Sequence, residues 1–319
     1  MSLKARVFIS CGQRKDTDES LIAKEIADKL EKMEFEPYVA VAEQTLKGVK
    51  ENIFNRLKES EYFLFIDFKR ERLYLPNGIL QRFKDTHMHR GSLFSHQELG
   101  LATFLDYEVL AFQEEGIKKD DGILGFIQAN CIPFSERRHL PSIVVDKVKE
   151  RKWDSNWRNE LILRRKLSDF EDAQAPNQGI GRYYHIEVFN AHKDKMARNC
   201  VAYIEKIKNL VNGNTRILEL VELKWKGVTN VGVSIAPRQS RYIDAFHINL
   251  SNQSLAHLGI NPFVVDWQGY FNDYQISGSG DYEIDYVVFS ENFSPARATF
   301  RLHIDSQIDG VAFASSLPT

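Results

Sequence analysis

This 319-residue chain contains few cysteines and no long apolar run. Its three cysteines (Cys11, Cys131, Cys200) lie far apart without paired spacing, which indicates neither a disulfide framework nor a zinc site. Sparse cysteine favours a reducing, cytoplasmic setting. No apolar run approaches the roughly 18 residues of a membrane span, so we expect no membrane partner. The first residues lead straight into a predicted strand, and we expect no signal peptide.

The chain also lacks a large excess of charge of either sign. The formal net charge is −2, whereas a protein that binds DNA or RNA normally has a basic surplus, so we expect no nucleic-acid partner. The sequence has neither a Walker-type phosphate loop nor a GxGxxG motif. Its histidines are scattered, so no metal site is predicted.

What is present is typical of a globular protein: 43% hydrophobic and 27% charged residues. The length suggests two domains. A charged, irregular stretch begins near residue 140, and we place the boundary there. This predicts an N-terminal domain over 1–140, and a linker with a second domain over 141–319.

The N-terminal part alternates between predicted strands and helices, which favours an α/β fold with a parallel sheet and helices on both faces. The expected strands are 6–10, 35–41, 61–67, 108–112 and 131–134, and the helices between them begin near residues 21, 49, 91 and 122. Such sheets bind ligands at the carboxyl ends of their strands. That edge should gather the loop after Ser10, the loop over 46–48 and the start of the helix over 91–105.

Glu98 is the notable residue of the helix over 91–105, because it lies among apolar neighbours one turn from the expected start. One interpretation is a capping box, with Ser95 as N-cap and Glu98 three residues on, which involves no chemistry. The other is a functional carboxylate that faces a pocket. Glu98→Gln separates them, since glutamine still caps a helix but carries no negative charge.

Five short segments in order resemble a TIR domain, over residues 4 to about 135. They are Val7-Phe-Ile-Ser10, a helix, the segment from Phe35 to Val41 with a loop ending Leu46-Lys-Gly48, Ser60-Glu-Tyr-Phe-Leu-Phe65, and Ser92-Leu-Phe-Ser-His-Gln-Glu98-Leu. The last is similar to the family's S-x-W-C-x-x-E-L pattern, with Phe94 in place of Trp and Ser95 in place of Cys. Two departures stand out: Cys11 follows the first strand, and the segment between Asp67 and Ser92 is long.

The resemblance implies a flavodoxin-like, TIR-like sheet and, from the bacterial members, an enzyme that cleaves NAD at the nicotinamide–ribose bond or makes cyclic ADP-ribose signals in antiviral defence signalling. NAD is then a substrate and not a cofactor. Glu98 is implied as the catalytic carboxylate. Phe8 and Ser10 are expected to line the ribose side, although Phe8 also reads as core. Arg14 is expected near the diphosphate, and Ser95 and Lys47 complete the binding set.

The loop around Lys47 is also similar to the loop through which TIR domains pack on each other, so we expect homo-oligomers formed by this domain. His96 we expect at the surface beside the helix start. Two alternatives stay open: a non-enzymatic assembly protein, and an N-glycosidase of the nucleoside deoxyribosyltransferase type, which shares the flavodoxin-like sheet and also uses a Glu.

The C-terminal part shows period-two alternation typical of strands, over 159–164, 183–189, 200–207, 217–225, 242–250, 282–289 and 298–304. Turn signals such as Asn212-Gly-Asn separate them. The pattern predicts an all-β, Ig-like sandwich. No residue there suggests catalysis, so we expect a recognition or regulatory role.

Overall fold

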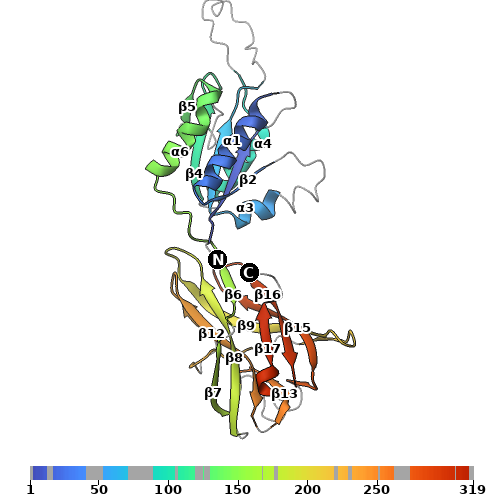
Figure 1. Cartoon of the computed structure of the whole chain (residues 1–319). Helices are drawn as coiled ribbons and strands as arrows, with labels where there is room; N and C mark the ends of the chain where they lie inside the picture. Colours follow the sequence, from blue (N-terminus) through green and yellow to red (C-terminus); the bar gives the residue numbers. More distant parts are fainter. Residues whose placement is uncertain are drawn as a thin grey trace, which may run out of the picture. The chain divides into compact units, whose positions relative to one another are not determined.

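The computed structural model describes residues 3–12, 17–40, 53–70, 89–104, 107–118, 125, 130–166, 168–175, 179–218, 222–228, 232–250, 252–261, 274–305 and 307–315. The chain divides into two compact units, Ser2–Arg158 and Asn159–Thr319. The first is an α/β domain and the second is rich in antiparallel strands (Figure 1). None of the described helices combines the length and apolar character needed to span a bilayer. The predicted helix over 122–127 and the loop over 44–48 lie outside the residues described, apart from residue 125.

The α/β domain is built on a five-stranded parallel sheet in the order β2-β1-β3-β4-β5, a doubly wound order. The strands are β1 (Arg6–Cys11), β2 (Glu36–Val39), β3 (Tyr62–Asp67), β4 (Glu108–Glu114) and β5 (Ile132–Phe134). Every residue of β3, the central strand, is buried, as expected for a strand with both faces covered. The predicted α/β architecture is therefore confirmed.

Helices cover both faces of this sheet, and the strand residues alternate between them (Figure 1). Val7, Ile9 and Leu64 pack on the face covered by α1 (Glu19–Lys32) and α6 (Leu140–Glu150). Phe8 and Phe63 pack on the opposite face, under α3 (Asn55–Glu59) and α4 (Leu93–Phe104). Because side chains alternate with period two along a strand, Ser10 lies on the same face as Phe8, toward α4.

The first domain extends past residue 140, where the sequence suggested a linker. A 3₁₀ turn (Arg137–His139) leads into α6, whose Leu140, Val144 and Val148 are buried in the domain core. Beyond it, Trp153 stacks on Tyr62 at 4.2 Å between ring centroids, and Trp157 Nε1 donates to the Tyr62 hydroxyl at 3.0 Å. This segment is therefore part of the α/β domain.

The second domain consists of two antiparallel six-stranded sheets that enclose one apolar core. One sheet has the order β14-β13-β12-β8-β6, with β7 also on β8: β6 (Leu161–Arg164), β7 (Phe170–Ala175), β8 (Gly179–Asn190), β12 (Ser240–Asn249), β13 (Asn252–Leu258) and β14 (Gln275–Ser277). The other has the order β10-β9-β15-β16-β17, with β11 also on β9: β9 (Ala197–Asn209), β10 (Thr215–Ile217), β11 (Val233–Ile235), β15 (Gly280–Phe289), β16 (Ala296–Ile304) and β17 (Ala312–Ser315). A short 3₁₀ turn (Ile308–Gly310) precedes β17.

The segment 217–225 differs from its prediction as one strand. Strand β10 ends at Ile217, and Glu222 and Trp225 form isolated bridges to Tyr203 and Ile243, which belong to different sheets. The segment therefore crosses from one sheet to the other. Its apolar residues include Trp225, which fills the core between the sheets and is 1% exposed.

Candidate functional site

The carboxyl ends of β1 and β3 and the first two turns of α4 bring several polar side chains together. Ser10 is the fifth residue of β1 and pairs with Phe65 of β3, one step before the sheet edge. Asp67 ends β3 and Gln113 lies near the end of β4, in register with it. All three side chains are buried. This is the edge at which doubly wound sheets bind ligands.

Glu98 points inward from α4 onto this edge. It is 3% exposed, and its Oε2 accepts a short hydrogen bond from the Ser10 hydroxyl. The contact follows from the two periodicities: Ser10 faces α4 because it lies two residues after Phe8, and Glu98 shares the inner face of α4 with Leu99 and Ala102. The two residues are 88 positions apart in the sequence.

Two other polar atoms of this helix face have no hydrogen-bond partner among the residues that the structure describes. They are Glu98 Oε1 and Ser95 Oγ, and both are buried. The two residues are three positions apart, so they lie on one face of the helix. Buried polar groups are normally paired, since leaving one unpaired costs about 1–3 kcal/mol. An acceptor and a hydroxyl side by side form a site that a polar ligand can complete.

Burial controls the ionisation of Glu98. Removal from water raises the pKa of its carboxyl from 4.5 to about 7, and the hydrogen bond from Ser10 partly offsets that increase. Near neutral pH the group is therefore present in both the acidic and the anionic form. A carboxyl group with a pKa shifted this far by burial is typical of a functional site.

Asp67 fixes the start of α4 relative to the sheet. Its carboxylate accepts hydrogen bonds from the Ser92 amide (3.0 Å) and the Gln113 side chain (3.2 Å), and it contacts His96 Nε2 at 2.8 Å. A Cβ on Gly91 would lie 2.2 Å from Asp67 Oδ2, so only glycine allows this approach. The prediction that His96 lies at the surface is wrong: it is 3% exposed, because this contact holds it inside.

The capping interpretation of Glu98 is also wrong. Helix α4 begins at Leu93, so Ser95 lies inside the helix and not at its N-cap. Instead the Ser95 amide is the donor to Ser92 Oγ, at 3.4 Å. Glu98 is in the second turn, where no free backbone amide remains for it to cap.

The other predicted binding residues have different positions. Phe8 is fully buried in the apolar core, with its ring 5.6 Å from Phe63 and 5.5 Å from Tyr38 between centroids. Phe8 is therefore a core residue of the strand that carries Ser10. Arg14 and Lys47 lie outside the residues that the structure describes.

One cation at this edge was missed by the sequence analysis. Arg70 follows β3 by three residues, and its guanidinium contacts Glu19 at 3.0 Å. A Cβ on Gly12 would lie 1.8 Å from its Nη2, so the guanidinium is packed against the chain two residues after Ser10. No motif or spacing in the sequence links Arg70 to Gly12, because the contact depends on how the loops fold.

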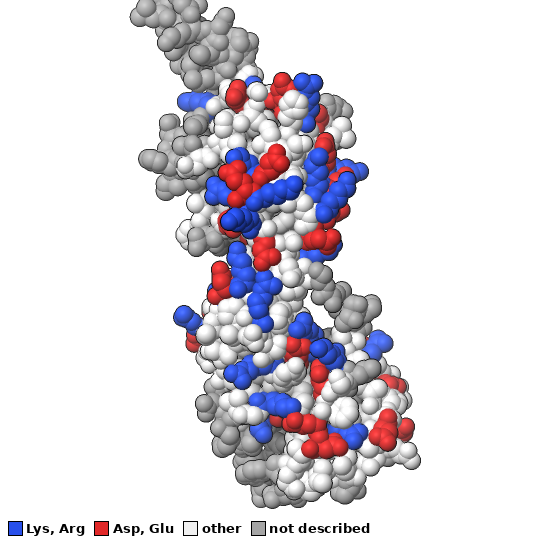
Figure 2. Space-filling model, turned by 60° about the vertical axis from the view of Figure 1, so that its left-hand side comes forward, with Lys and Arg blue, Asp and Glu red and all other residues white. Residues whose placement is uncertain are grey.

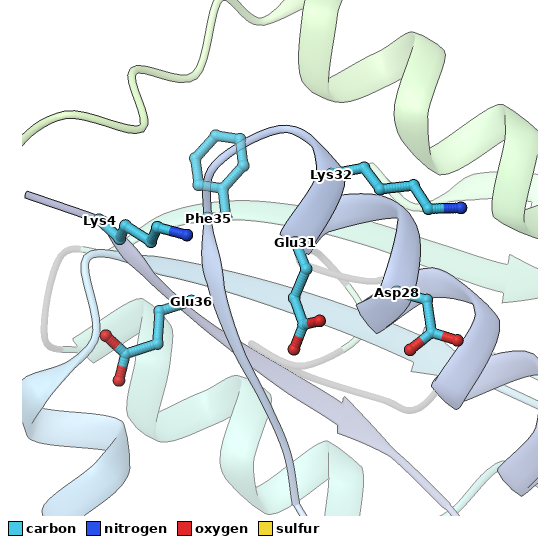
Figure 3. A pocket seen from close by; sticks show the side chains of 6 residues that line it. All are labelled: Lys4, Asp28, Glu31, Lys32, Phe35 and Glu36. Carbon is cyan, nitrogen blue, oxygen red and sulfur yellow. The ribbon is translucent and has the colours of Figure 1, made fainter. Parts of the chain in front are cut away.

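A shallow hollow of about 560 Å³ is lined by Lys4, Asp28, Glu31, Lys32, Phe35 and Glu36 (Figure 3). It lies at the amino edge of the sheet, opposite Glu98, and its lining residues carry both signs of charge. None of the predicted site residues that the structure describes lines it. In the part of the chain described, no group of three or more His, Cys, Asp or Glu side chains is arranged to hold a metal ion.

Comparisons with known proteins give little guidance. No family model matches the sequence, and no curated protein matches it. One similar solved structure is described as the X-ray structure of Northeast Structural Genomics Consortium target SoR45. It has 16% sequence identity and a TM-score of 0.23, and the match covers 50% of this chain and 94% of the other. The proposals below therefore depend on the geometry of the site.

Proposed function

We propose that the N-terminal domain is a TIR-like enzyme that breaks the bond between nicotinamide and ribose in NAD, with Glu98 as its catalytic carboxylate. The observation that carries the proposal is the state of Glu98. It is buried at the carboxyl edge of a parallel sheet and hydrogen-bonded to Ser10 through one oxygen, and its other oxygen has no partner within the described part of the chain.

The reaction suits a site with a single carboxylate. The leaving group is a cationic pyridinium, and it departs as neutral nicotinamide with the electron pair of the broken C–N bond. It needs no proton, unlike the leaving group of an ordinary glycoside, for which two carboxyl groups act together. The sugar carbon becomes cationic and then bonds to water, which loses a proton, or to a nitrogen of the adenine, which gives a cyclic product.

Anionic Glu98 stabilises that cationic sugar. A preorganised charge in a site shielded from water contributes about 3 kcal/mol or more to the transition state. We expect Glu98 Oε1 and the Ser95 hydroxyl to bind sugar hydroxyl groups. Ser10 holds the other carboxylate oxygen and keeps the side chain in one orientation.

The wider proposal concerns the whole chain. The strand order 2-1-3-4-5 is flavodoxin-like, which supports a TIR-like fold for the first domain. Two antiparallel sheets around one core support an Ig-like sandwich for the second. We assign the second domain a regulatory role, in a cytoplasmic protein of bacterial antiviral defence signalling.

The direct test is nicotinamide release from NAD by the purified full chain. Glu98→Gln should lower the rate by at least about 100-fold, since it keeps the shape of the side chain and removes the charge. Glu61→Gln is the matched control: Glu61 is also buried but lies at the amino edge, where it accepts from the Arg6 amide. Equal rates for wild type and Glu98→Gln would overturn the proposal.

A second function, assembly without catalysis, is favoured by a separate observation. The outer face of α4 exposes Leu93, Leu101 and Phe104, which are 52%, 40% and 87% exposed. Apolar side chains exposed together on one helix are typical of interaction sites. Self-association that survives Glu98→Gln, with no loss of NAD by any variant, would support this function. Base exchange on deoxynucleosides without NAD cleavage would instead support the deoxyribosyltransferase type.

A further inference from the structure

Arg70 is a largely buried cation at the carboxyl edge of the sheet. Its side chain is 12% exposed, and one guanidinium nitrogen contacts Glu19, which is 2% exposed. The Arg70 amide donates to the Arg90 carbonyl at 2.8 Å, which ties the segment after β3 to the segment before α4. A cation is thereby held at the same sheet edge as Glu98.

The residues around the Arg70 guanidinium show how far it lies from the Glu98 carboxylate. It fills the space beside Gly12, where a Cβ would lie 1.8 Å from Arg70 Nη2 and 3.0 Å from the Ser92 Cβ. Gly12 is two residues beyond Ser10, or roughly 7 Å of extended chain. Because Ser10 bonds Glu98, the cation lies on the order of one sugar unit away from the carboxylate.

The hydrogen-bonding capacity of Arg70 is only partly used. Its Nε is buried and has no hydrogen-bond partner among the residues described. A guanidinium carries five N–H donors in a planar fork, and it binds phosphate through two parallel hydrogen bonds. A single contact with Glu19 leaves donors that an anion can satisfy once the side chain turns away from that carboxylate.

We propose that Arg70 binds the phosphate next to the reacting ribose, and that Glu19 restrains it when no substrate is bound. The inference rests on the proposed function for the nature of the substrate, and it narrows the substrate class to phosphorylated nucleotides. A nucleoside without phosphate would still reach Glu98 but would gain nothing from Arg70.

The test compares NAD with nicotinamide riboside, which has the same bond to break but no phosphate. Arg70→Gln should raise the KM for NAD by about 10-fold or more and leave the KM for the riboside unchanged. Glu19→Gln should lower the KM for NAD, because it frees Arg70 from its anionic partner. A purely structural ion pair predicts that both variants shift both substrates in the same direction.

The matched control is Arg158→Gln. Arg158 is 15% exposed and pairs with Glu36 at 2.5 Å, at the opposite edge of the sheet, so its loss should leave both KM values unchanged. If Arg70→Gln does not fold, Arg70→Lys replaces it: lysine keeps the charge but not the planar fork, so a partial rise of the KM for NAD alone is expected. Equal effects on NAD and riboside would refute the assignment.

A binding measurement separates this inference from the proposed function. ADP-ribose carries the diphosphate but has no nicotinamide to release, and calorimetric titration detects its binding without turnover. Binding of ADP-ribose by Glu98→Gln that is lost in Arg70→Gln supports the role of Arg70 even if no NAD is cleaved. Equal ADP-ribose binding by wild type and Arg70→Gln overturns it.

Discussion

At the scale of single residues, the charge of Glu98 opposes folding. Because its pKa is about 7 in the folded protein and 4.5 ordinarily, the folded state binds its proton more tightly than the unfolded state. The associated stability is fully present below pH 4.5 and is lost as the pH rises through about 7. A shift of this size corresponds to about 3 kcal/mol.

We therefore expect Glu98→Gln to stabilise the protein at about pH 8, by up to roughly 3 kcal/mol, and to change stability little near pH 4.5. Urea unfolding at both pH values measures the difference. Glu61→Gln makes the same change at a buried glutamate outside the site and serves as the comparison. A gain that is the same at both pH values would mean that burial does not hold the Glu98 carboxyl in its neutral form.

Ser10 controls the pH dependence of the proposed reaction. Its hydrogen bond lowers the pKa of Glu98, so Ser10→Ala should raise that pKa further above 7. Since the anion is the active form, the rate should rise with pH, with a midpoint near 7 in the wild type and a higher midpoint in the variant. Rates of nicotinamide release between about pH 5 and 9 reveal the midpoint.

The variant should thus lose activity at pH 7 and recover most of it at high pH. Ser60→Ala is a suitable control, because Ser60 is also buried but donates to the Arg56 carbonyl at the amino edge of the sheet. An unchanged midpoint in Ser10→Ala would show that the hydroxyl does not act on the reacting carboxyl.

The sequence indicated part of this site and missed the rest for a physical reason. The positions of Ser10 and Glu98 follow from strand and helix periodicity, together with the rule that ligands bind at the carboxyl ends of parallel strands, whereas Ser95 and the role of Glu98 were implied by the resemblance to TIR domains. The buried contact of Asp67 with His96 and the position of Arg70 beside Gly12 join residues tens of positions apart. Such contacts depend on loop paths, which local sequence patterns do not specify.

At the scale of elements, Asp67 links the start of α4 to the sheet. Asp67→Ala would leave the Ser92 amide and the Gln113 side chain without this acceptor and would remove the buried contact with His96. Each unpaired buried group costs about 1–3 kcal/mol, so we expect a loss of roughly 3 kcal/mol or more in stability. Urea unfolding measures this loss.

The same change should lower the rate of NAD cleavage, because the first turn of α4 positions Glu98. Asp146→Ala provides the comparison, since Asp146 is exposed on α6 and should cost little. Full stability in Asp67→Ala would mean that core packing alone, through Leu99 and Ala102, fixes the helix.

The outer face of α4 is a candidate surface for self-association. Phe104 is 87% exposed, and the described helix carries no charged side chain other than the buried Glu98. In a two-fold dimer the same face of each copy meets the other, so charged residues on that face can repel one another. An uncharged face avoids this repulsion. We expect Phe104→Ser to weaken self-association at least several-fold, as measured by sedimentation velocity.

Leu21→Ser tests whether any exposed apolar residue has this effect. Leu21 is 71% exposed on α1, which covers the opposite face of the sheet. It should leave the association constant unchanged. Equal weakening by both variants would indicate non-specific aggregation, and no association by the wild type would remove α4 as an interface.

Strands were easier to predict than the ends of domains. The run over Tyr62–Asp67 is continuously apolar, and the alternation in β8, β9, β12, β15 and β16 is regular, so these elements are evident from the sequence. Helix α6 was missed because charged residues surround it, although Leu140, Val144 and Val148 recur at helical spacing. Short edge strands such as β14 and β17 have too few residues to show a period.

At the scale of the whole molecule, charge gives no single-sign surface on the face shown in Figure 2. Lysine and arginine side chains intermingle there with aspartate and glutamate. Ion pairs also join neighbouring elements of the α/β domain, such as Arg137 with Glu114 at 2.8 Å. This mixture agrees with a net charge of −2, and the expectation of no nucleic-acid partner stays a prediction.

The two compact units indicate where the chain can be cut into fragments that fold. Each has its own apolar core, so we expect the fragment 1–158 to fold alone. A fragment that stops at residue 140 loses most of α6 together with Trp153 and Trp157, which cover Tyr62 and Phe35. Loss of those aromatic contacts costs several kcal/mol, a large part of the stability of a domain.

Far-UV circular dichroism and urea titration of the two fragments measure this difference. The fragment 1–158 should unfold in one cooperative transition, and the fragment 1–140 should unfold without cooperativity or aggregate. The longer fragment is then the one in which to test NAD cleavage without the second domain. Cooperative unfolding of both fragments would show that the segment from α6 to Trp157 is dispensable and would move the domain boundary back to about residue 140.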